Sequence, residues 1–430
     1  MYPSLSRFLA NKRASYERWP SSAKVFLPRG RVPAAGEIFV QADLGRTLKY
    51  LADEERKVAR RKGRKAGLQA VREAFYQGDI AAQVVKFIKA QGGFMSREDF
   101  AEYRVTFEPT IKTRFAGIEL HACGPWSQGP MLPMTLNLLK GYDLKALGHN
   151  SPQYIHLLVE ALKLSFSDRH NYFGDPKFVD VPMKGLMSER YAAYRRSLID
   201  PGKAWTEMPP AGDPRTLTQV ENQWMPEPET EHGPGPGDTS YICVVDKDRN
   251  AFSATPSDGS DQTPIIPGVG IVCSGRGTQS WTDAGHPAML VPGKRPRLTP
   301  NPALAFKNGE LLMPFGTPSG DVQTQAMLQV FLNINVFGMA PQEAVEAPRF
   351  ATYNYPGSFQ PHPYFPGRLQ IENRFDHSVS DALEALGHKV FRWDDMTPRA
   401  GSVCAIVNDR KHGVLHGGAD PRRPAYVLGW

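Results

Sequence analysis

Residues 208–237 divide this chain of 430 residues, because they cannot form a long helix or a central strand. Proline and glycine are concentrated there, above all in the run Gly233-Pro234-Gly235-Pro236-Gly237. Proline lacks the backbone N–H that helices and sheets use, so these residues are predicted to be a long exposed connection. Taken alone, the stretch would be interpreted as a linker between domains.

The residues before this stretch predict mainly helices. Ser96 and Asp99 form a capping box that marks a helix beginning at Arg97. Ser151 followed by Pro152 marks the start of another helix. The apolar residues on one face of that second helix, expected to pack against a sheet, are Ile155, Leu158, Val159, Leu162 and Phe166.

The residues after the stretch predict strands joined by tight turns. Residues 241–245 and 251–255 form one expected hairpin. Residues 303–306 and 311–315 form another around the turn Asn308-Gly309. A glycine-rich turn then leads into an expected buried helix over 321–337. Further helices are expected near 341–347 and 379–386, and further strands at 402–407 and 414–416.

Composition favours a globular protein that binds neither nucleic acid nor a membrane. Hydrophobic residues make up 41% of the chain, and no apolar run approaches the roughly 18 residues of a membrane span. The net charge of +7 is concentrated in a helical segment around residues 56–65, which is best explained as a solvated face. Binding of an anionic partner there is the minor alternative. The first ten residues lack a secretory signal, so a cytoplasmic location is expected.

Neither a metal nor a cofactor is predicted. The four cysteines are widely scattered, without the spacing of a zinc site or a redox motif. Reduced and mostly buried thiols are therefore expected at Cys123, Cys243, Cys273 and Cys404.

Thr239 is a candidate nucleophile. A threonine hydroxyl is a weak nucleophile unless a base takes its proton, and an N-terminal threonine can use its own α-amine, whose ordinary pKa is about 8. An internal threonine gains that amine only when the bond to Asp238 is broken. From these residues alone a plain turn before a strand is the better interpretation, because Gly, Asp and Thr are common in turns.

Ordered motifs across nearly the whole chain favour a catalytic role for Thr239 over a plain turn. The segment GDTSYICVVDKDRNAFSAT at 237–255 resembles the self-cleaving segment of the γ-glutamyltransferase family. Further matches to the family, in the same order as in its members, are residues 124–129, 161–169, 292–296, 316–320, 347–350 and 418–422.

The resemblance implies an N-terminal-nucleophile hydrolase, a four-layer αββα sandwich made as one precursor and cut between Asp238 and Thr239. It predicts a large chain, 1–238, and a small chain, 239–430, that stay together as a heterodimer forming one composite domain. Thr239 would attack an amide carbonyl and Ser257 would assist it. The backbone amides of Ser319 and Gly320 would bind the oxyanion. The plainer roles are a strand-end hydroxyl for Ser257 and a helix cap for the turn.

Several positions depart from the family pattern for γ-glutamyl substrates. Tyr241, Gly259 and Ser280 stand where the family usually has a histidine, an asparagine and an acidic residue, and Leu298 and Thr299 replace a serine pair. By the resemblance, a substrate amine and carboxylate would lose contacts here.

Other residues in these segments could bind an anionic acid, although arginines are more often surface or loop-bracing residues. The candidate substrate-binding residues are Tyr241, Arg276, Gln279, Arg297 and Thr299.

These departures resemble the branch that contains oxamate amidohydrolase, so a small acid amide is the expected substrate. A true γ-glutamyltransferase or glutathione hydrolase is one alternative, and a noncatalytic shortened relative is another. Family members usually carry a further N-terminal segment before the position of Met1. The chain is therefore expected to be a fragment, to have a misplaced start, or to be a shortened relative with unpaired sheet edges.

Overall fold

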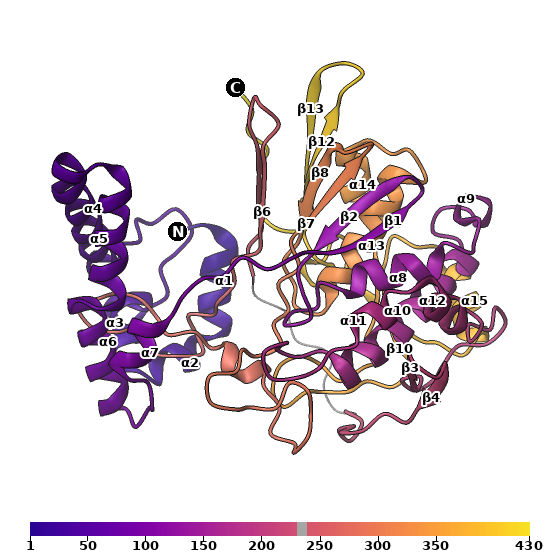
Figure 1. The fold of residues 1–430 in the computed structure, drawn as a ribbon, viewed down its shortest axis with the longest axis horizontal. Helices are drawn as coiled ribbons and strands as arrows, with labels where there is room; N and C mark the ends of the chain where they lie inside the picture. Colours follow the sequence, from indigo (N-terminus) through magenta and orange to yellow (C-terminus); the bar gives the residue numbers. More distant parts are fainter. Residues whose placement is uncertain (230–238) are drawn as a thin grey trace. The chain divides into compact units, whose positions relative to one another are not determined.

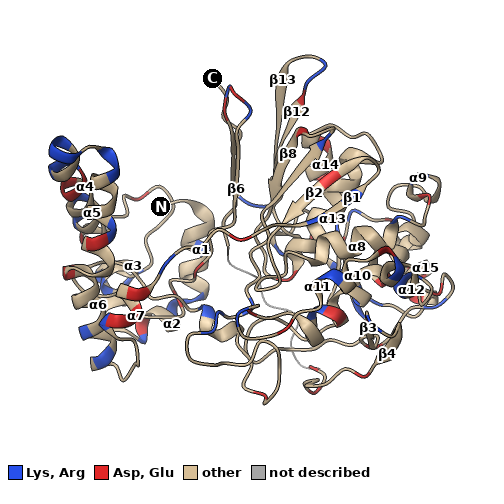
Figure 2. Cartoon of the chain, in the orientation of Figure 1, with Lys and Arg blue, Asp and Glu red and all other residues tan. Residues whose placement is uncertain are grey.

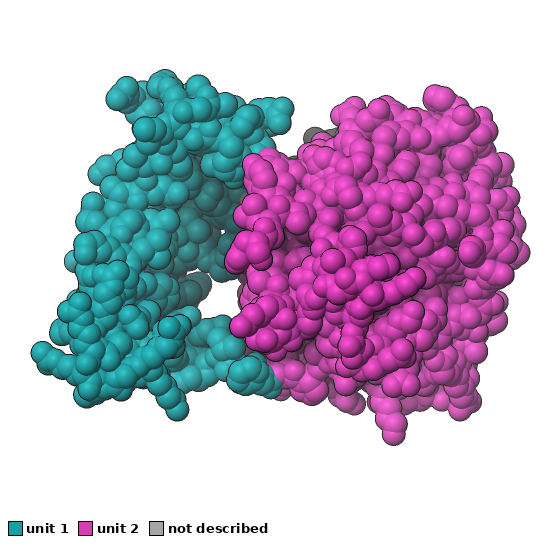
Figure 3. Space-filling model, turned by 90° about the horizontal axis from the view of Figure 1, so that it is seen from above, with its two compact units in different colours: residues 1–107, 258–275 teal, residues 108–257, 276–430 magenta. Residues whose placement is uncertain are grey.

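The structure, a computed structural model, describes residues 1–229 and 239–430 and contains two compact units (Figure 3). The smaller unit comprises residues 1–107 and 258–275, and the larger comprises residues 108–257 and 276–430. Each unit contains residues from both sides of position 239, so these units differ from the two predicted chains. The division into chains 1–238 and 239–430 stays a prediction.

The smaller unit is built from helices around two apolar clusters. One cluster surrounds Leu9, Tyr16 and Phe26, and the other surrounds Ile80 and Val84. Its helices are α1 (Pro3–Asn11), α2 (Arg13–Glu17), α3 (Pro20–Phe26), η1 (Pro28–Gly30), α4 (Ala42–Lys62), α5 (Arg64–Tyr76), α6 (Asp79–Ala90) and α7 (Arg97–Glu102). The capping box of Ser96 and Asp99 before α7 is confirmed.

The basic segment is helical and exposed, as predicted. Figure 2 shows its Lys and Arg residues gathered where α4 ends and α5 begins. Gly63 separates the two helices because its φ of 82° is a left-handed conformation that suits glycine. The basic residues that lie exposed here are Arg56, Lys57, Arg60, Arg61, Lys62, Arg64 and Lys65.

An antiparallel sheet of six strands organises the described part of the larger unit (Figure 1). In spatial order the strands are β1 (Ile111–Phe115), β2 (Ile118–Ala122), β7 (Ala303–Lys307), β8 (Glu310–Gly316), β12 (Cys404–Asp409) and β13 (Val414–Ala419). Strand β2 pairs with β7, so that Ile118 lies opposite Lys307 and Ala122 opposite Ala303. The ladder of backbone hydrogen bonds therefore joins strands from before and after residue 239.

Helices cover one face of this sheet. Helices α8 (Met131–Leu139) and α13 (Val322–Asn335) lie against the strands, and α10 (Pro152–Tyr172) packs on α8. Phe331 of α13 stacks on Phe315 of β8, with ring centroids 5.9 Å apart. Helix α10 is capped by Ser151 as predicted, but it is buried around its whole circumference from Tyr154 to His170.

The hairpin of β5 (Ile242–Val245) and β6 (Ala251–Ala254) lies on the opposite face of the sheet. Successive residues of a strand face opposite sides, so a Cβ added to Gly316 would point away from the helices that Phe315 contacts. That Cβ would meet the ring of Tyr241, just before β5. Helices, main sheet and hairpin therefore form successive layers, and the predicted α/β sandwich is confirmed.

Residues 208–229 are not exposed throughout, contrary to the prediction. Ala211 and Met208 are buried, and a short hairpin begins at Ala211. The hydroxyls of Tyr172 and Tyr191 donate to the carbonyl oxygen of Gly212 at 2.9 and 3.0 Å. The larger unit thus satisfies the backbone groups of this segment, which local composition did not reveal.

Shorter elements complete the larger unit. Strand β10 (Arg368–Glu372) runs parallel to β11 (Lys389–Trp393) and antiparallel to β9 (Phe350–Thr352) in a second sheet. None of the described helices combines the length and apolar composition needed to cross a membrane. The four cysteines are free, as predicted, although they are only half-buried. The further elements are α9 (Leu144–Leu147), α11 (Met183–Leu186), α12 (Glu189–Arg196), β3 (Ala211–Asp213), β4 (Thr218–Val220), η2 (Arg276–Gln279), α14 (Pro341–Glu346), β9 (Phe350–Thr352), β10 (Arg368–Glu372), α15 (His377–Ala385), β11 (Lys389–Trp393) and η3 (Pro398–Ala400).

Candidate active site

Thr239 and Ser257 meet at the open end of the β5–β6 hairpin. Thr239 lies just before β5 and Ser257 just after β6, and the N–H of Ser240 donates to the carbonyl oxygen of Pro256 at 2.9 Å. This pairing brings the Oγ atoms of Thr239 and Ser257 to 2.7 Å from each other. Thr239 is 7% exposed. Asp238, the other residue of the predicted cleavage site, lies outside the described residues.

Arg276 binds Ser257 at two points. Its Nε donates to the carbonyl oxygen of Ser257 at 3.2 Å, and its Nη2 donates to the Oγ of the same residue. The guanidinium carbon lies 5.3 Å from the ring centroid of Phe359. The structure thus places a candidate substrate-binding residue directly on the hydroxyl that contacts Thr239.

The turn after β8 presents two backbone N–H groups. Ser319 has a φ of 95° and Gly320 a φ of 52°, and the left-handed conformation is strained for Ser319 because it carries a Cβ. Neither N–H donates to another residue within the described ranges. Helix α13 begins directly behind the turn, and its dipole favours negative charge at this end. Such N–H groups can bind an oxyanion, and that role stays a prediction for Ser319 and Gly320.

Side chains from distant segments hold this turn. The Oγ of Ser319 donates to the carbonyl oxygen of Pro398 at 3.1 Å and accepts from Nη2 of Arg423 at 3.0 Å. The Nε2 of Gln128 donates to the carbonyl oxygens of Gly320, at 2.8 Å, and of Thr299, at 2.6 Å. Gln128 belongs to a segment that resembles the family, but sequence reasoning assigned it no role.

Asp321, which directly follows the turn, stabilises it through a buried ion pair. Its carboxylate binds Arg169, and it accepts hydrogen bonds from the N–H of Ser358 at 2.8 Å and from its Oγ at 2.6 Å. Burial alone would raise the pKa of Asp321, but the charge of Arg169 and these hydrogen bonds hold that pKa below its ordinary value. The carboxylate therefore stays charged at neutral pH.

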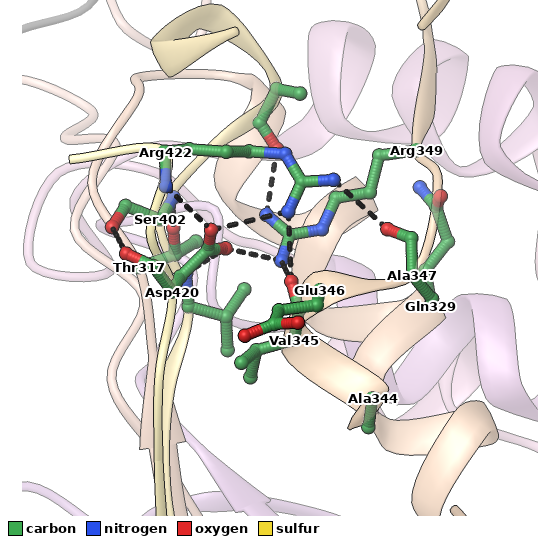
Figure 4. Close-up of polar contacts among 12 residues, drawn as sticks. Thr317, Gln329, Ala344, Val345, Glu346, Ala347, Arg349, Ser402, Asp420 and Arg422 are labelled. Carbon is green, nitrogen blue, oxygen red and sulfur yellow. Dashed lines mark hydrogen bonds and ion pairs between the residues drawn. The ribbon is translucent and has the colours of Figure 1, made fainter. Parts of the chain in front are cut away.

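Two of the motifs noted in the sequence meet in a buried ion cluster (Figure 4). Asp420 binds Arg349, and it accepts from Nη1 of Arg422 at 3.1 Å. The Oγ of Ser402 donates to the carbonyl oxygen of Asp420 at 3.3 Å, and its N–H donates to Oγ1 of Thr317 at 2.7 Å. Since Thr317 belongs to the 316–320 turn, these motifs support the turn rather than line the reaction site.

Comparison with known proteins decides the family. The sequence model described as Gamma-glutamyltranspeptidase matches residues 1–430. The chain belongs to the γ-glutamyltranspeptidase family. It is 32% identical over 412 residues to the Glutathione hydrolase-like YwrD proenzyme of Bacillus subtilis (strain 168), which covers 95% of this chain and 70% of that protein. The solved structure of LmbA2991HD matches with a TM-score of 0.91 and 32% identity, over 99% of this chain and 75% of that one.

The family includes amidohydrolases and acylases as well as glutathione hydrolases. The Oxamate amidohydrolase proenzyme of Klebsiella pneumoniae is 27% identical over 423 residues, covering 98% of this chain and 71% of that protein. The chain spans 66% of a matched acylase proenzyme and 63% of a matched glutathione hydrolase proenzyme. Proenzyme members of this kind confirm the resemblance noted in the sequence.

Three more of the candidate substrate-binding residues lie around the turn that follows β8. The hydroxyl of Tyr241 lies 2.7 Å from the Oγ of Ser253, and its ring lies over Gly316. The Nε2 of Gln279 donates to Oγ1 of Thr299 at 3.3 Å. Gln279 and Thr299 are therefore brought together, and Gln128 connects both to the Ser319–Gly320 turn.

Arg297 is fully buried rather than a surface residue. Its Nη1 donates to the carbonyl oxygen of Arg169 at 3.1 Å, whereas its Nε and Nη2 have no hydrogen-bond partner among the described residues. Burial and the charge of Arg169 lower the pKa of Arg297 to about 9. Burial and Arg297 together lower the pKa of His170 to about 3, so this neighbouring ring is neutral. Arg297 thus carries a buried positive charge that one backbone carbonyl binds and that the charge of Arg169 opposes.

A further cluster of two histidines and a glutamate has the residue types that can bind a metal ion. One ligand atom each from His156, Glu160 and His388 lies within 4.8 Å of the others. The Nζ of Lys163 donates to Oε1 of Glu160 at 2.7 Å, and both side chains are fully buried. Because Lys163 already neutralises the carboxylate, we interpret the cluster as a buried link between α10 and the segment before β11.

Proposed function

We propose that this chain is a self-processing amidohydrolase that forms an acyl ester on Thr239. The observation that carries the proposal is the pair of hydroxyls, with the Oγ of Thr239 2.7 Å from that of Ser257 at the start of β5. A second observation supports it: Phe359 contacts Arg276, which binds Ser257, and lies 3.6 Å from a Cβ added at Gly320. Phe359 therefore lies next to both Arg276 and the Ser319–Gly320 turn.

Self-processing would begin when the Oγ of Thr239 attacks the carbonyl carbon of Asp238. The hydroxyl proton passes to the amide nitrogen of Thr239, the C–N bond breaks, and an ester and a free α-amine result. Water then hydrolyses the ester, which releases the carboxylate of Asp238 and restores the hydroxyl. This order supplies the base that an internal threonine lacks.

Turnover would repeat the same chemistry on a substrate amide. The α-amine of Thr239 takes the hydroxyl proton while Oγ attacks the carbonyl carbon, and the N–H groups of Ser319 and Gly320 bind the negative oxygen. Collapse of the intermediate expels the amine product, which takes the proton from the α-ammonium group. Water then attacks the ester, and the Oγ regains a proton.

A small anionic amide such as oxamate is the proposed substrate class. Arg297 carries a fully buried guanidinium, and the nearby carboxylate of Asp321 is already bound by Arg169. An uncompensated buried charge is unfavourable, so a substrate carboxylate would stabilise it. The Oxamate amidohydrolase proenzyme among the relatives supports the same class. The Glutathione hydrolase-like relative favours a γ-glutamyl substrate as the second candidate.

One experiment tests the reaction and separates the two substrate classes. Purified protein is followed by intact mass spectrometry and then assayed for ammonia release from oxamate and for amine release from a γ-glutamyl anilide. We expect two chains, the smaller beginning at Thr239, and release from oxamate. Thr239→Ala should stay uncut and inactive, whereas Thr239→Ser should retain both reactions in part. An active sample without a chain end at residue 239 would refute the proposal.

A further inference from the structure

Ser257 can assist Thr239 only if its hydroxyl points toward the Oγ of Thr239. A serine side chain has three staggered positions, and contacts to its oxygen favour one of them. Arg276 supplies that selection, because its Nε binds the carbonyl oxygen of Ser257 while its Nη2 binds the Oγ. Two contacts from one planar group fix the side chain relative to its own backbone.

We propose that Arg276 is a positioning residue that orients the hydroxyl of Ser257 and, through it, the nucleophilic hydroxyl of Thr239. This inference rests on the proposed function and names a determinant of its rate. It differs from the expectation that Arg276 binds the substrate, since the guanidinium binds Ser257 through both Nε and Nη2.

Charge adds to the effect of geometry. A hydroxyl that accepts a hydrogen bond from a guanidinium is polarised, which makes its own O–H a stronger donor. The 2.7 Å contact lets Ser257 direct that O–H at the Oγ of Thr239. The Oγ carries negative charge when the ester forms or breaks, so this donor stabilises both steps.

The location of Arg276 suits this role. It begins the short helix η2, and its guanidinium lies over Phe359. The same ring lies 3.6 Å from a Cβ added at Gly320. One aromatic side chain therefore lies next to both Arg276 and the Ser319–Gly320 turn.

The test compares Arg276→Gln, Arg276→Lys and Arg276→Ala with wild type. Arg249→Gln is the matched control, because Arg249 lies half-buried in the turn between β5 and β6 and donates to the carbonyl oxygen of Gly413. Two rates are measured: the appearance of the chain that begins at residue 239, by mass spectrometry, and kcat with KM for oxamate. Thermal unfolding reports whether each variant is folded.

We expect Arg276→Gln to slow cutting and to lower kcat about 100-fold, the cost of a misplacement of about 1 Å at a reacting group. KM should change less than about threefold, because the substrate contacts are intact. Arg276→Lys keeps the charge but not the planar fork, so it should recover only part of the rate. Added guanidinium should raise the rate of Arg276→Ala about tenfold and leave wild type unchanged.

Three results would overturn the inference. Wild-type cutting and kcat in Arg276→Gln would show that the contact is incidental. A raised KM with unchanged kcat would make Arg276 a substrate ligand. If Arg276→Gln fails to fold, Arg276→Lys with full wild-type kcat would exclude the two-point contact. The proposed function fails separately, when wild type itself neither cuts nor hydrolyses either substrate.

Discussion

Gly316→Ala should disturb Thr239 through the ring of Tyr241, which faces Gly316. A Cβ at Gly316 would lie 2.3 Å from Cε2 and 2.6 Å from Cδ2 of Tyr241, whereas ordinary contacts begin near 3.4 Å. The ring is half-buried and joined through its backbone to β5, so it must move by about 1 Å to reach ordinary contact. Overpacking of this kind costs about 1–3 kcal/mol of stability. Because Tyr241 is two residues from Thr239, a displacement of that size should slow cutting about 100-fold.

Urea unfolding and the rate of appearance of the 239 chain end measure the two effects. Gly45→Ala is the control, because nothing lies within 4 Å of its added Cβ in helix α4. In a double-mutant cycle, Tyr241→Ala should remove most of the penalty of Gly316→Ala, since the clash needs both side chains. Additive effects of the two substitutions, or wild-type cutting by Gly316→Ala, would refute this reasoning.

Two further predictions concern the supports of the oxyanion turn. Asp321→Asn should cost about 3–5 kcal/mol at neutral pH, because it leaves Arg169 buried without its partner. The pKa of Asp321 is lowered on folding, so its stabilisation is present above about pH 4 and is lost as pH falls through that lowered pKa. The difference in the free energy of unfolding between wild type and Asp321→Asn, measured with urea, should therefore become smaller at acidic pH. A difference that does not change with pH would contradict the prediction. Gln128→Leu removes the donor to two buried carbonyls and should lower kcat more than it raises KM, whereas the exposed Gln69→Leu should change neither; equal kinetics for both would exclude the role of Gln128.

Local structure could be predicted from the sequence where local signals are strong. The turn Asn308-Gly309 connects β7 and β8 with φ values of 54° and 79°, as its sequence requires. The pairing of β2 with β7 could not be predicted in this way, because no local sequence pattern marks a contact between segments almost half the chain apart. The burial of Ala211 was missed for the same reason, since distant residues bind that segment.

Thr239 and Ser257 were predicted as a pair through the resemblance to the family, since the residues alone favoured a plain turn. Ser257 falls opposite Thr239 once β5 and β6 pair. The support provided by Gln128 and Asp321 was not predictable, because an amide and a carboxylate have many possible partners. Arg297 shows the limit of residue statistics, since arginine is usually exposed and this one is fully buried.

The pairing of β2 with β7 constrains when the chain can be cut. A break after residue 238 would leave a single sheet built from two polypeptides, with ten residues facing one another across the joint in five backbone pairs. Pieces separated before that ladder forms would each have to find the other by diffusion, with an open strand edge exposed to aggregation. If the proposed cut occurs, maturation would follow a natural order: the uncut precursor assembles first, and its covalent continuity becomes dispensable afterwards.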